Sequence, residues 1–326
     1  MERSGRLERA AAADLQAAAG LARRVAANVA RAVEVRDEVL EQVVISLAAD
    51  GHVLIEDYPG VGKTALARAL ARSIGGQFAR VQCTPDLLPA DIVGANVYNQ
   101  REQRFEFRPG PVFANVVLVD EVNRASPKTQ SGLLECMQER HVTVDVHTHE
   151  LARPFLVLAT QNPIEYEGTY PLPEAQVDRF LVRLSLGYPE REAEAAMLAA
   201  HEAGDRVLEL ETVASPTDVV ALQDTATRVL ASEALRDYVV AVLAHTRADP
   251  RVELGASPRA GLMLLRAAKA RALLEGRDHA LPDDVQALAQ PVLAHRLLPA
   301  PETVGVPADE TRRAVVDAAI EATPAL

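Results

Sequence analysis

The residues around Gly60 and Gly62 are suited to binding phosphate. The segment DYPGVGKT, residues 57–64, follows a short apolar stretch and precedes an alanine- and leucine-rich stretch with helical period. A glycine turn at the N-terminus of a helix directs several backbone N–H groups at one anion. Lys63 would reach the terminal phosphates of a nucleoside triphosphate, and the Thr64 hydroxyl would ligate Mg²⁺. The predicted nucleotide contacts are Gly60, Val61, Gly62, Lys63, Thr64 and Ala65.

An ordinary glycine-containing turn between a strand and a helix is the alternative at this position. The full phosphate-binding pattern begins with a glycine where this chain has Asp57. The lysine favours the phosphate site, because only three of the 34 basic residues are lysines: Lys63, Lys128 and Lys269. In a chain that otherwise uses arginine, a lysine in this pattern is a meaningful signal.

Two acids end another strongly apolar segment. Residues 116–120, VVLVD, have the continuous apolar character of a strand buried on both faces of a sheet, and Glu121 follows. In a phosphoryl-transfer site an aspartate at a strand end holds Mg²⁺, so Asp120 is a predicted metal ligand with Thr64. Glu121 is the predicted general base, because its carboxylate can polarise the attacking water. A solvated acid pair after a core strand is the alternative.

Three further polar residues are candidates for the same reaction. Asn162 follows an apolar strand, so it would lie at the carboxyl edge of the sheet and could align the water. Its alternative role is a turn cap. Arg179 precedes the last strand and could extend toward a neighbouring subunit as an arginine finger. Arg259 begins a helix and could reach back to the nucleotide. The alternative for Arg179 is a surface salt bridge with an acid such as Asp178 or Glu174, and the alternative for Arg259 is a solvated arginine.

Strands and helices alternate through the first part of the chain, which predicts an α/β fold with a parallel sheet. Helices are expected between about residues 21 and 49 and over residues 63–74. Prolines in the second part, Pro291 among them, are interpreted as helix starts. Apolar strands are expected at residues 52–57, 78–82, 116–120, 155–160 and 180–184.

These patterns divide the chain into three segments. Residues 1–20 are rich in alanine and arginine and are interpreted as a loose or helical N-terminal leader. Residues 21–188 would form the α/β core. Residues 189–326 have almost wholly helical period and would form a separate C-terminal domain.

The composition excludes several classes of protein. The formal net charge is −12, which argues against a general nucleic-acid or membrane-surface binder. No apolar run approaches about 18 residues, so no membrane span is expected. Cys83 and Cys136 have no metal-type spacing and suggest reduced thiols in a cytoplasmic protein. His147 and His149 could share a strand face, but no third ligand is near them, so a solvated hairpin is the preferred interpretation.

Taken together, these residues resemble the MoxR family of AAA+ ATPases. The similarity runs from about residue 21 to the C-terminus and is strongest over residues 112–140 and 157–181. It extends to three short blocks, TPDLLP at residues 84–89, FEFRPGP at 105–111 and GASPRA at 255–260.

The resemblance implies a RecA-like αβα P-loop core, a small all-helical C-terminal lid and an oligomeric ring, usually a hexamer. ATP would lie between adjacent subunits, with Mg²⁺. The matched positions are Lys63 and Thr64 in Walker A, Asp120 and Glu121 in Walker B, Asn162 as sensor 1, Arg179 as the finger and Arg259 as sensor 2.

Members of the family also carry inserted hairpins, which are expected here at residues 94–108 and 141–150 and could face the ring pore. They often work beside a protein with a von Willebrand factor A domain, so such a partner is implied. Asp57 is usual in the family. Val35 is a departure, because a glycine is expected there near the adenine; the base contacts are therefore in question, and the phosphate chemistry is not.

The leading hypothesis is a cytoplasmic ATPase that remodels or matures a protein client. One rival is an AAA+ machine that acts on DNA or transcription. The acidic charge and the lack of a recognisable helix-turn-helix segment or GAFTGA loop argue against it. The other rival is a nucleotide-gated scaffold with negligible turnover, which the intact set of Glu121, Asn162 and Arg179 argues against.

Overall fold

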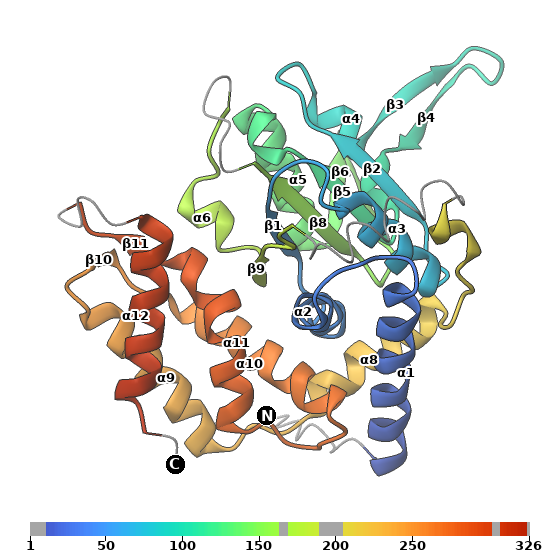
Figure 1. Ribbon diagram of the computed structural model, residues 1–326. Helices are drawn as coiled ribbons and strands as arrows, with labels where there is room; N and C mark the ends of the chain where they lie inside the picture. Colours follow the sequence, from blue (N-terminus) through green and yellow to red (C-terminus); the bar gives the residue numbers. More distant parts are fainter. Residues whose placement is uncertain (1–10, 163–168, 189–204, 302–306, 325–326) are drawn as a thin grey trace, which may run out of the picture.

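The computed structural model describes residues 11–162, 169–188, 205–301 and 307–324, which form an α/β core and a helical region (Figure 1). The core sheet has five parallel strands in the order β2-β5-β8-β1-β9. The central strands are apolar and buried along most of their length, as expected for a sheet covered on both faces. The predicted parallel sheet is confirmed. Its strands are β1 (Val53–Glu56), β2 (Phe78–Gln82), β5 (Val116–Asp120), β8 (Leu156–Gln161) and β9 (Val182–Leu184).

Helices cover both faces of this sheet. Because successive side chains of a strand point in opposite directions, a wholly apolar strand places apolar side chains on both faces. On β5, Val116 and Leu118 pack into one buried cluster, while Val117 and Val119 pack into another. The αβα core of the prediction is therefore present. The first cluster contains residues of α1 (Ala12–Ala30), α2 (Asp37–Ala48) and α3 (Lys63–Ser73), and the second contains residues of α4 (Pro89–Val93) and α5 (Pro127–Glu139).

Helix α1 runs across the expected end of the leader at residue 20. Leu15, Ala18 and Ala19 are buried, and α1 packs against α3 of the core and against α8 and α10 of the helical region. Residues 12–20 are therefore part of the packed structure and not a separate leader. The sequence did not indicate this, because the buried face consists largely of alanines, which give only a weak apolar period.

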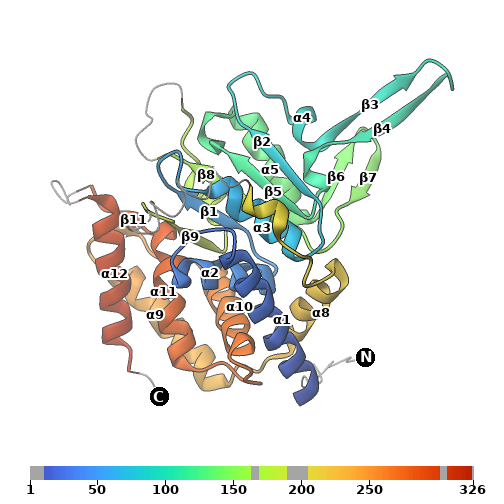
Figure 2. The same cartoon turned by 45° about the vertical axis from the view of Figure 1, so that its right-hand side comes forward.

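Two antiparallel hairpins occur where the sequence predicted them. Strand β3 (Gly94–Asn99) pairs with β4 (Arg104–Pro109), and β6 (His141–Val144) pairs with β7 (His147–Glu150). The first hairpin projects far beyond the sheet, and the second lies beside its base (Figure 2). Gly94 is required at that base, because its φ is +95° and a Cβ there would lie 2.3 Å from the carbonyl oxygen of Arg108.

The helical region consists mainly of five helices: α8 (Pro216–Arg228), α9 (Glu233–Ala248), α10 (Pro258–Leu274), α11 (Pro282–Leu293) and α12 (Ala308–Ala322). Ser215, Ser232 and Ser257 cap three of these helices by accepting a hydrogen bond from the N–H three residues later. The expectation that Pro291 marks a helix start was wrong. It lies in the last turn of α11, where the missing N–H affects only the end of the helix.

A short antiparallel pair joins β10 (Val252–Leu254) to β11 (Leu298–Pro299), so the region is predominantly rather than entirely helical. Because the two strands come from distant parts of the chain, sequence patterns gave no signal for their pairing. The remaining short elements are α6 (Glu174–Val177) and the 3₁₀ turns η1 (Pro111–Phe113), η2 (Val122–Arg124), η3 (Arg206–Glu209) and η4 (Ala294–Arg296).

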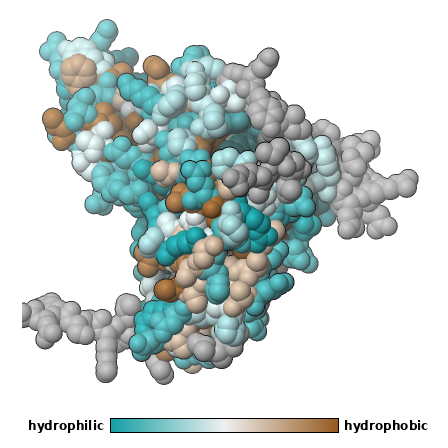
Figure 3. All heavy atoms as spheres, turned by 90° about the vertical axis from the view of Figure 1, so that its left-hand side faces the viewer, coloured by the Kyte–Doolittle hydropathy of each residue, from teal (hydrophilic) through white to brown (hydrophobic). Residues whose placement is uncertain are grey.

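On the face seen in Figure 3, hydrophilic residues predominate and the hydrophobic ones are scattered. None of the helices in the described ranges combines the length and the apolar character that crossing a bilayer requires.

Candidate active site

The loop between β1 and α3 has the backbone shape expected of a phosphate cradle. Gly60 and Gly62 have φ values of +87° and +91°, in the left-handed region that favours glycine. A Cβ at either position would meet nothing within 4 Å, so backbone conformation rather than space explains both glycines. Gly62 is the N-cap of α3, and the first-turn N–H groups of a helix attract anions.

A cavity of about 360 Å³ lies at this loop and at the carboxyl ends of β5 and β8. It brings together most of the predicted site residues, although they come from three separate parts of the chain. Val61 is buried beside the cavity, 6% exposed. The lining residues are Asp57, Pro59, Gly60, Gly62, Lys63, Thr64, Ala65, Arg80, Gln82, Asp120, Glu121 and Asn162.

Lys63 points back into its own loop. Its Nζ donates a hydrogen bond to the backbone oxygen of Asp57 at 3.0 Å. Burial lowers the pKa of Lys63, and the nearby carboxylates of Asp120, Asp57 and Glu121 partly offset that effect. The ammonium group is therefore held by the backbone oxygen of Asp57 at the cavity wall.

The two acids at the end of β5, Asp120 and Glu121, are held by different partners. The Thr160 hydroxyl donates to Oδ1 of Asp120 at 2.6 Å, and Arg80 pairs with Oδ2 at 2.7 Å. Glu121 accepts from Gln82 at 3.0 Å and from Arg124 at 2.9 Å. Both carboxylates line the cavity.

Sequence reasoning missed Arg80, Gln82, Arg124 and Thr160. Arg80 and Gln82 alternate along β2, and the pairing of β2 with β5 places Gln82 beside Asp120. The two polar residues at period two were the available signal, but only the strand order shows what they contact. Thr160 was noted only as the end of an apolar strand, yet it is fully buried and contacts both acids.

The side chains at the cavity fit Mg²⁺ by their chemistry. Thr64 offers a hydroxyl oxygen and Asp120 a carboxylate oxygen, and Mg²⁺ prefers oxygen ligands. Sites of this kind use one or two carboxylates and complete the coordination with phosphate and water oxygens. The predicted pair of metal ligands is therefore adequate for a Mg-nucleotide.

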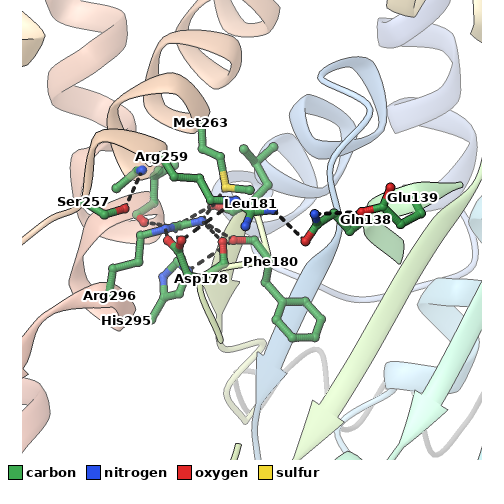
Figure 4. A network of polar contacts seen from close by, with 12 residues as sticks. Gln138, Glu139, Asp178, Phe180, Leu181, Ser257, Arg259, Met263, His295 and Arg296 are labelled. Atoms are coloured by element: carbon green, nitrogen blue, oxygen red, sulfur yellow. Dashed lines mark hydrogen bonds and ion pairs between the residues drawn. The ribbon is translucent and has the colours of Figure 1, made fainter. Parts of the chain in front are cut away.

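Neither Arg179 nor Arg259 lines this cavity. Figure 4 shows Arg259 in a polar network with Asp178 and Arg296. Arg179 donates to the backbone oxygen of Leu134 at 2.6 Å. Arg259 lies 3.9 Å from Asp178 and donates to Gln138 at 3.3 Å. The structure thus places Arg259 beside the Asp178–Arg179 segment, not at the P-loop of its own chain.

Arg296 anchors the same segment. Its side chain is 2% exposed, pairs with Asp178 at 2.8 Å and donates to the backbone oxygen of Phe180. Burial lowers the pKa of Arg296 to about 10, and the Asp178 carboxylate opposes that shift. The segment before β9 is therefore fixed to the helical region by two arginines, and sequence reasoning had noted neither contact.

Comparison with known proteins covers both parts of the chain. Residues 52–182 match the family described as ATPase family associated with various cellular activities (AAA), and residues 244–317 match the AAA lid domain. The chain is 44% identical over 280 residues to Chaperone MoxR1 of Mycobacterium tuberculosis, which covers 83% of this chain and 74% of that protein. The chain belongs to the MoxR family of AAA ATPases.

Two other similarities agree with this family. The MoxR-family chain is 51% identical over 275 residues to the Bacillus subtilis protein YeaC, covering 84% of this chain and 86% of that one. A crystal structure of a protein from Cytophaga hutchinsonii superposes with a TM-score of 0.89 at 36% identity, covering 96% of this chain and 97% of the other. The expected AAA+ core and helical lid are confirmed, and the chain is an ATPase.

Proposed function

We propose that this MoxR-family ATPase hydrolyses Mg-ATP in an oligomeric ring, a hexamer on the family pattern, and uses the reaction to remodel or mature a protein client. One observation carries the hydrolytic part of the proposal. A single cavity gathers the predicted phosphate, metal and base residues: Lys63, Thr64, Asp120, Glu121 and Asn162. Separate structural roles would not require these side chains to meet.

Each residue has a distinct task in this proposal. The backbone N–H groups of residues 60–65 and the Lys63 ammonium bind the phosphates. Thr64 and Asp120 hold Mg²⁺, which supplies electrostatic stabilisation of the charge on the transferred phosphoryl group. Glu121 accepts the proton of the attacking water, and Asn162 orients that water. Gln82 and Arg124 hold the Glu121 carboxylate in place.

Arg179 and Arg259 would act on a neighbouring subunit's nucleotide. Both lie outside the cavity of their own chain and close to Asp178, which is the side on which we expect a neighbouring subunit to dock. An arginine supplied in trans stabilises transition-state charge. An oligomer is then a requirement of the chemistry, since each site would need residues from two chains.

The hairpins supply candidate contacts with a client. The distal end of the β3–β4 hairpin exposes Tyr98 and Phe105, which are 49% and 70% exposed and lie edge to face. Aromatic side chains of this kind contribute strongly to protein contacts. A partner with a von Willebrand factor A domain and a cytoplasmic location complete the proposal, as the family resemblance and the two buried, free cysteines suggest.

The test is Glu121→Gln, which keeps the shape of the side chain and removes its basicity. Steady-state phosphate release should fall by about 10² or more, while ATP affinity by calorimetry stays close to that of the parent. Glu135→Gln, an identical change at an exposed position of α5, is the matched control and should not alter turnover. Undiminished phosphate release by Glu121→Gln would remove Glu121 from the proposed role.

A further inference from the structure

Asp57, the residue at the start of the P-loop, has a buried carboxylate that reaches out of the nucleotide site. The residue is 3% exposed. Its carboxylate accepts hydrogen bonds from the Ser185 hydroxyl at 3.0 Å, from the backbone N–H of Leu186, and from that of Gly187 at 3.3 Å. A buried carboxylate with three donors is a specific arrangement, because burying that charge without them would be strongly unfavourable.

The donors belong to residues 185–188, which follow β9 on the way to the helical region. Two further contacts hold this segment to the same part of the core. Tyr58, the next residue of the P-loop, stacks on Tyr188 with ring centroids 5.5 Å apart and an interplanar angle of 17°. Arg36 donates to the backbone oxygen of Ser185 at 2.9 Å. The start of the P-loop therefore holds the segment by which the chain leaves β9.

Asp57 also contacts the group that would bind phosphate. Its backbone oxygen accepts the hydrogen bond from Lys63 Nζ. A P-loop lysine reaches the terminal phosphates when a triphosphate is bound, so nucleotide binding would exchange this contact for one with phosphate. The backbone of Asp57 would then lose a partner, while its side chain still holds residues 185–188.

We propose that Asp57 is a positioning residue that couples nucleotide binding in the P-loop to residues 185–188. The inference rests on the proposed function, because it requires that the loop bind ATP. It assigns a purpose to an aspartate at a position where the general P-loop pattern has glycine. A glycine there would have no side chain to reach Ser185, Leu186 or Gly187.

The chain has no tryptophan, so Tyr188→Trp places a single fluorescent reporter in the segment. Mg-ATP binding to the full chain is measured by calorimetry, and the emission change is measured in parallel. We expect the reporter to respond to ATP. With Asp57→Asn added, the emission change at saturating ATP, compared per ATP bound, should fall about tenfold, because the amide nitrogen cannot accept hydrogen bonds from the backbone.

Two more variants test whether a loss of response is specific to the contacts of Asp57. Asp205→Asn removes an acid that pairs with Arg68 in the same region but does not contact the P-loop carboxylate; the response should be retained. Ser185→Ala removes one donor to Asp57 and leaves the charge, so it serves if Asp57→Asn does not fold. Its response should fall by about threefold, in line with the loss of one hydrogen bond.

The outcomes separate this inference from the proposed function. If the reporter protein binds ATP without an emission change, or if Asp57→Asn responds as fully as the reporter protein, the coupling is refuted. A full response from Ser185→Ala would refute it as well. If calorimetry detects no ATP binding by the unmodified chain, the proposed function itself fails, and the coupling fails with it.

Discussion

Asp120 and Glu121 are adjacent in the chain, yet their environments suit different tasks. The Asp120 side chain is 14% exposed and is held by Thr160 and Arg80. The Glu121 side chain is 27% exposed. Its backbone has a φ of +56°, which is uncommon outside glycine, and its N–H donates to Thr160. Such backbone strain persists where surrounding contacts hold it, and it occurs often at functional sites.

His52 gives a residue-scale prediction, because its two ring nitrogens require the neutral form. Nδ1 accepts a hydrogen bond from the Val157 N–H at 3.1 Å, so Nε2 carries the proton that faces the backbone oxygen of Met137 at 3.0 Å. Burial, with a further contribution from Arg140, lowers the pKa of His52 to about 3. As the pH falls, His52 is therefore protonated at a higher pH in the unfolded chain than in the folded one.

The contribution of His52 to stability is fully present above the unfolded pKa of about 6.5 and is lost as pH falls toward the folded pKa. The free energy of unfolding should fall by up to about 1.4 kcal/mol per pH unit below pH 6.5 from this group. Urea unfolding at several pH values checks this. In His52→Gln the pH slope should be smaller by that amount. Equal slopes for parent and His52→Gln would contradict the prediction.

At the scale of elements, the two hairpins are linked side to side. Phe107 of β4 stacks on His149 of β7 with centroids 3.9 Å apart, and Asn96 of β3 donates to Asp145 at 2.7 Å. Helix α5 ends where β6 begins, and its N-terminus lies a few residues after Glu121. A movement of α5 would therefore reach both hairpins together. His149, set aside as a metal ligand, has a packing role instead.

Breaking the stack should loosen the first hairpin. In Phe107→Ala, hydrogen exchange of the amides in residues 94–109 should quicken by about two- to tenfold, the range expected for one aromatic pair. His149→Ala should have an effect in the same direction. The effect of the double variant should fall short of the sum of the two, because both changes remove the Phe107–His149 stack, although each residue also contacts Phe113. Tyr98→Ala, at the exposed distal end, is the control and should leave exchange at the hairpin base unchanged. Fully additive effects would show that the stack does not link the hairpins.

At the scale of the whole molecule, the helical region is joined by ion pairs to the segment that carries Arg179. Asp178 contacts Arg296 and Arg259, which come from different parts of that region. A shift of the helical region would therefore carry Arg179 with it. If Arg179 acts on a neighbour's nucleotide, lid movement in one subunit would alter catalysis in the next.

Subunit mixing tests the shared site. Arg179→Ala chains keep their own Glu121, and Glu121→Gln chains keep their own Arg179. In a random equimolar ring, roughly a quarter of the interfaces would combine an intact base with an intact arginine from its neighbour. Phosphate release by the mixture should therefore recover toward roughly a quarter of the parent rate, although each variant alone is nearly inactive. No recovery, with assembly verified by light scattering, would count against a site shared between chains.

Local patterns in the sequence determined much of this protein. The five strands, the two hairpins, the capped helices and the glycine turn at Gly60 and Gly62 follow from apolar period, turn residues and helix caps, all of which act between residues close in the chain.

The tertiary structure decided what those elements contact. The strand order β2-β5-β8-β1-β9 placed Arg80 and Gln82 on the acids after β5, and the return of β9 beside β1 brought Ser185–Gly187 to Asp57. The packing of the helical region set Arg259 beside Asp178. These partners are separated by 39 to 130 positions in the chain, and no pattern within a single segment encodes which distant segment will lie beside it.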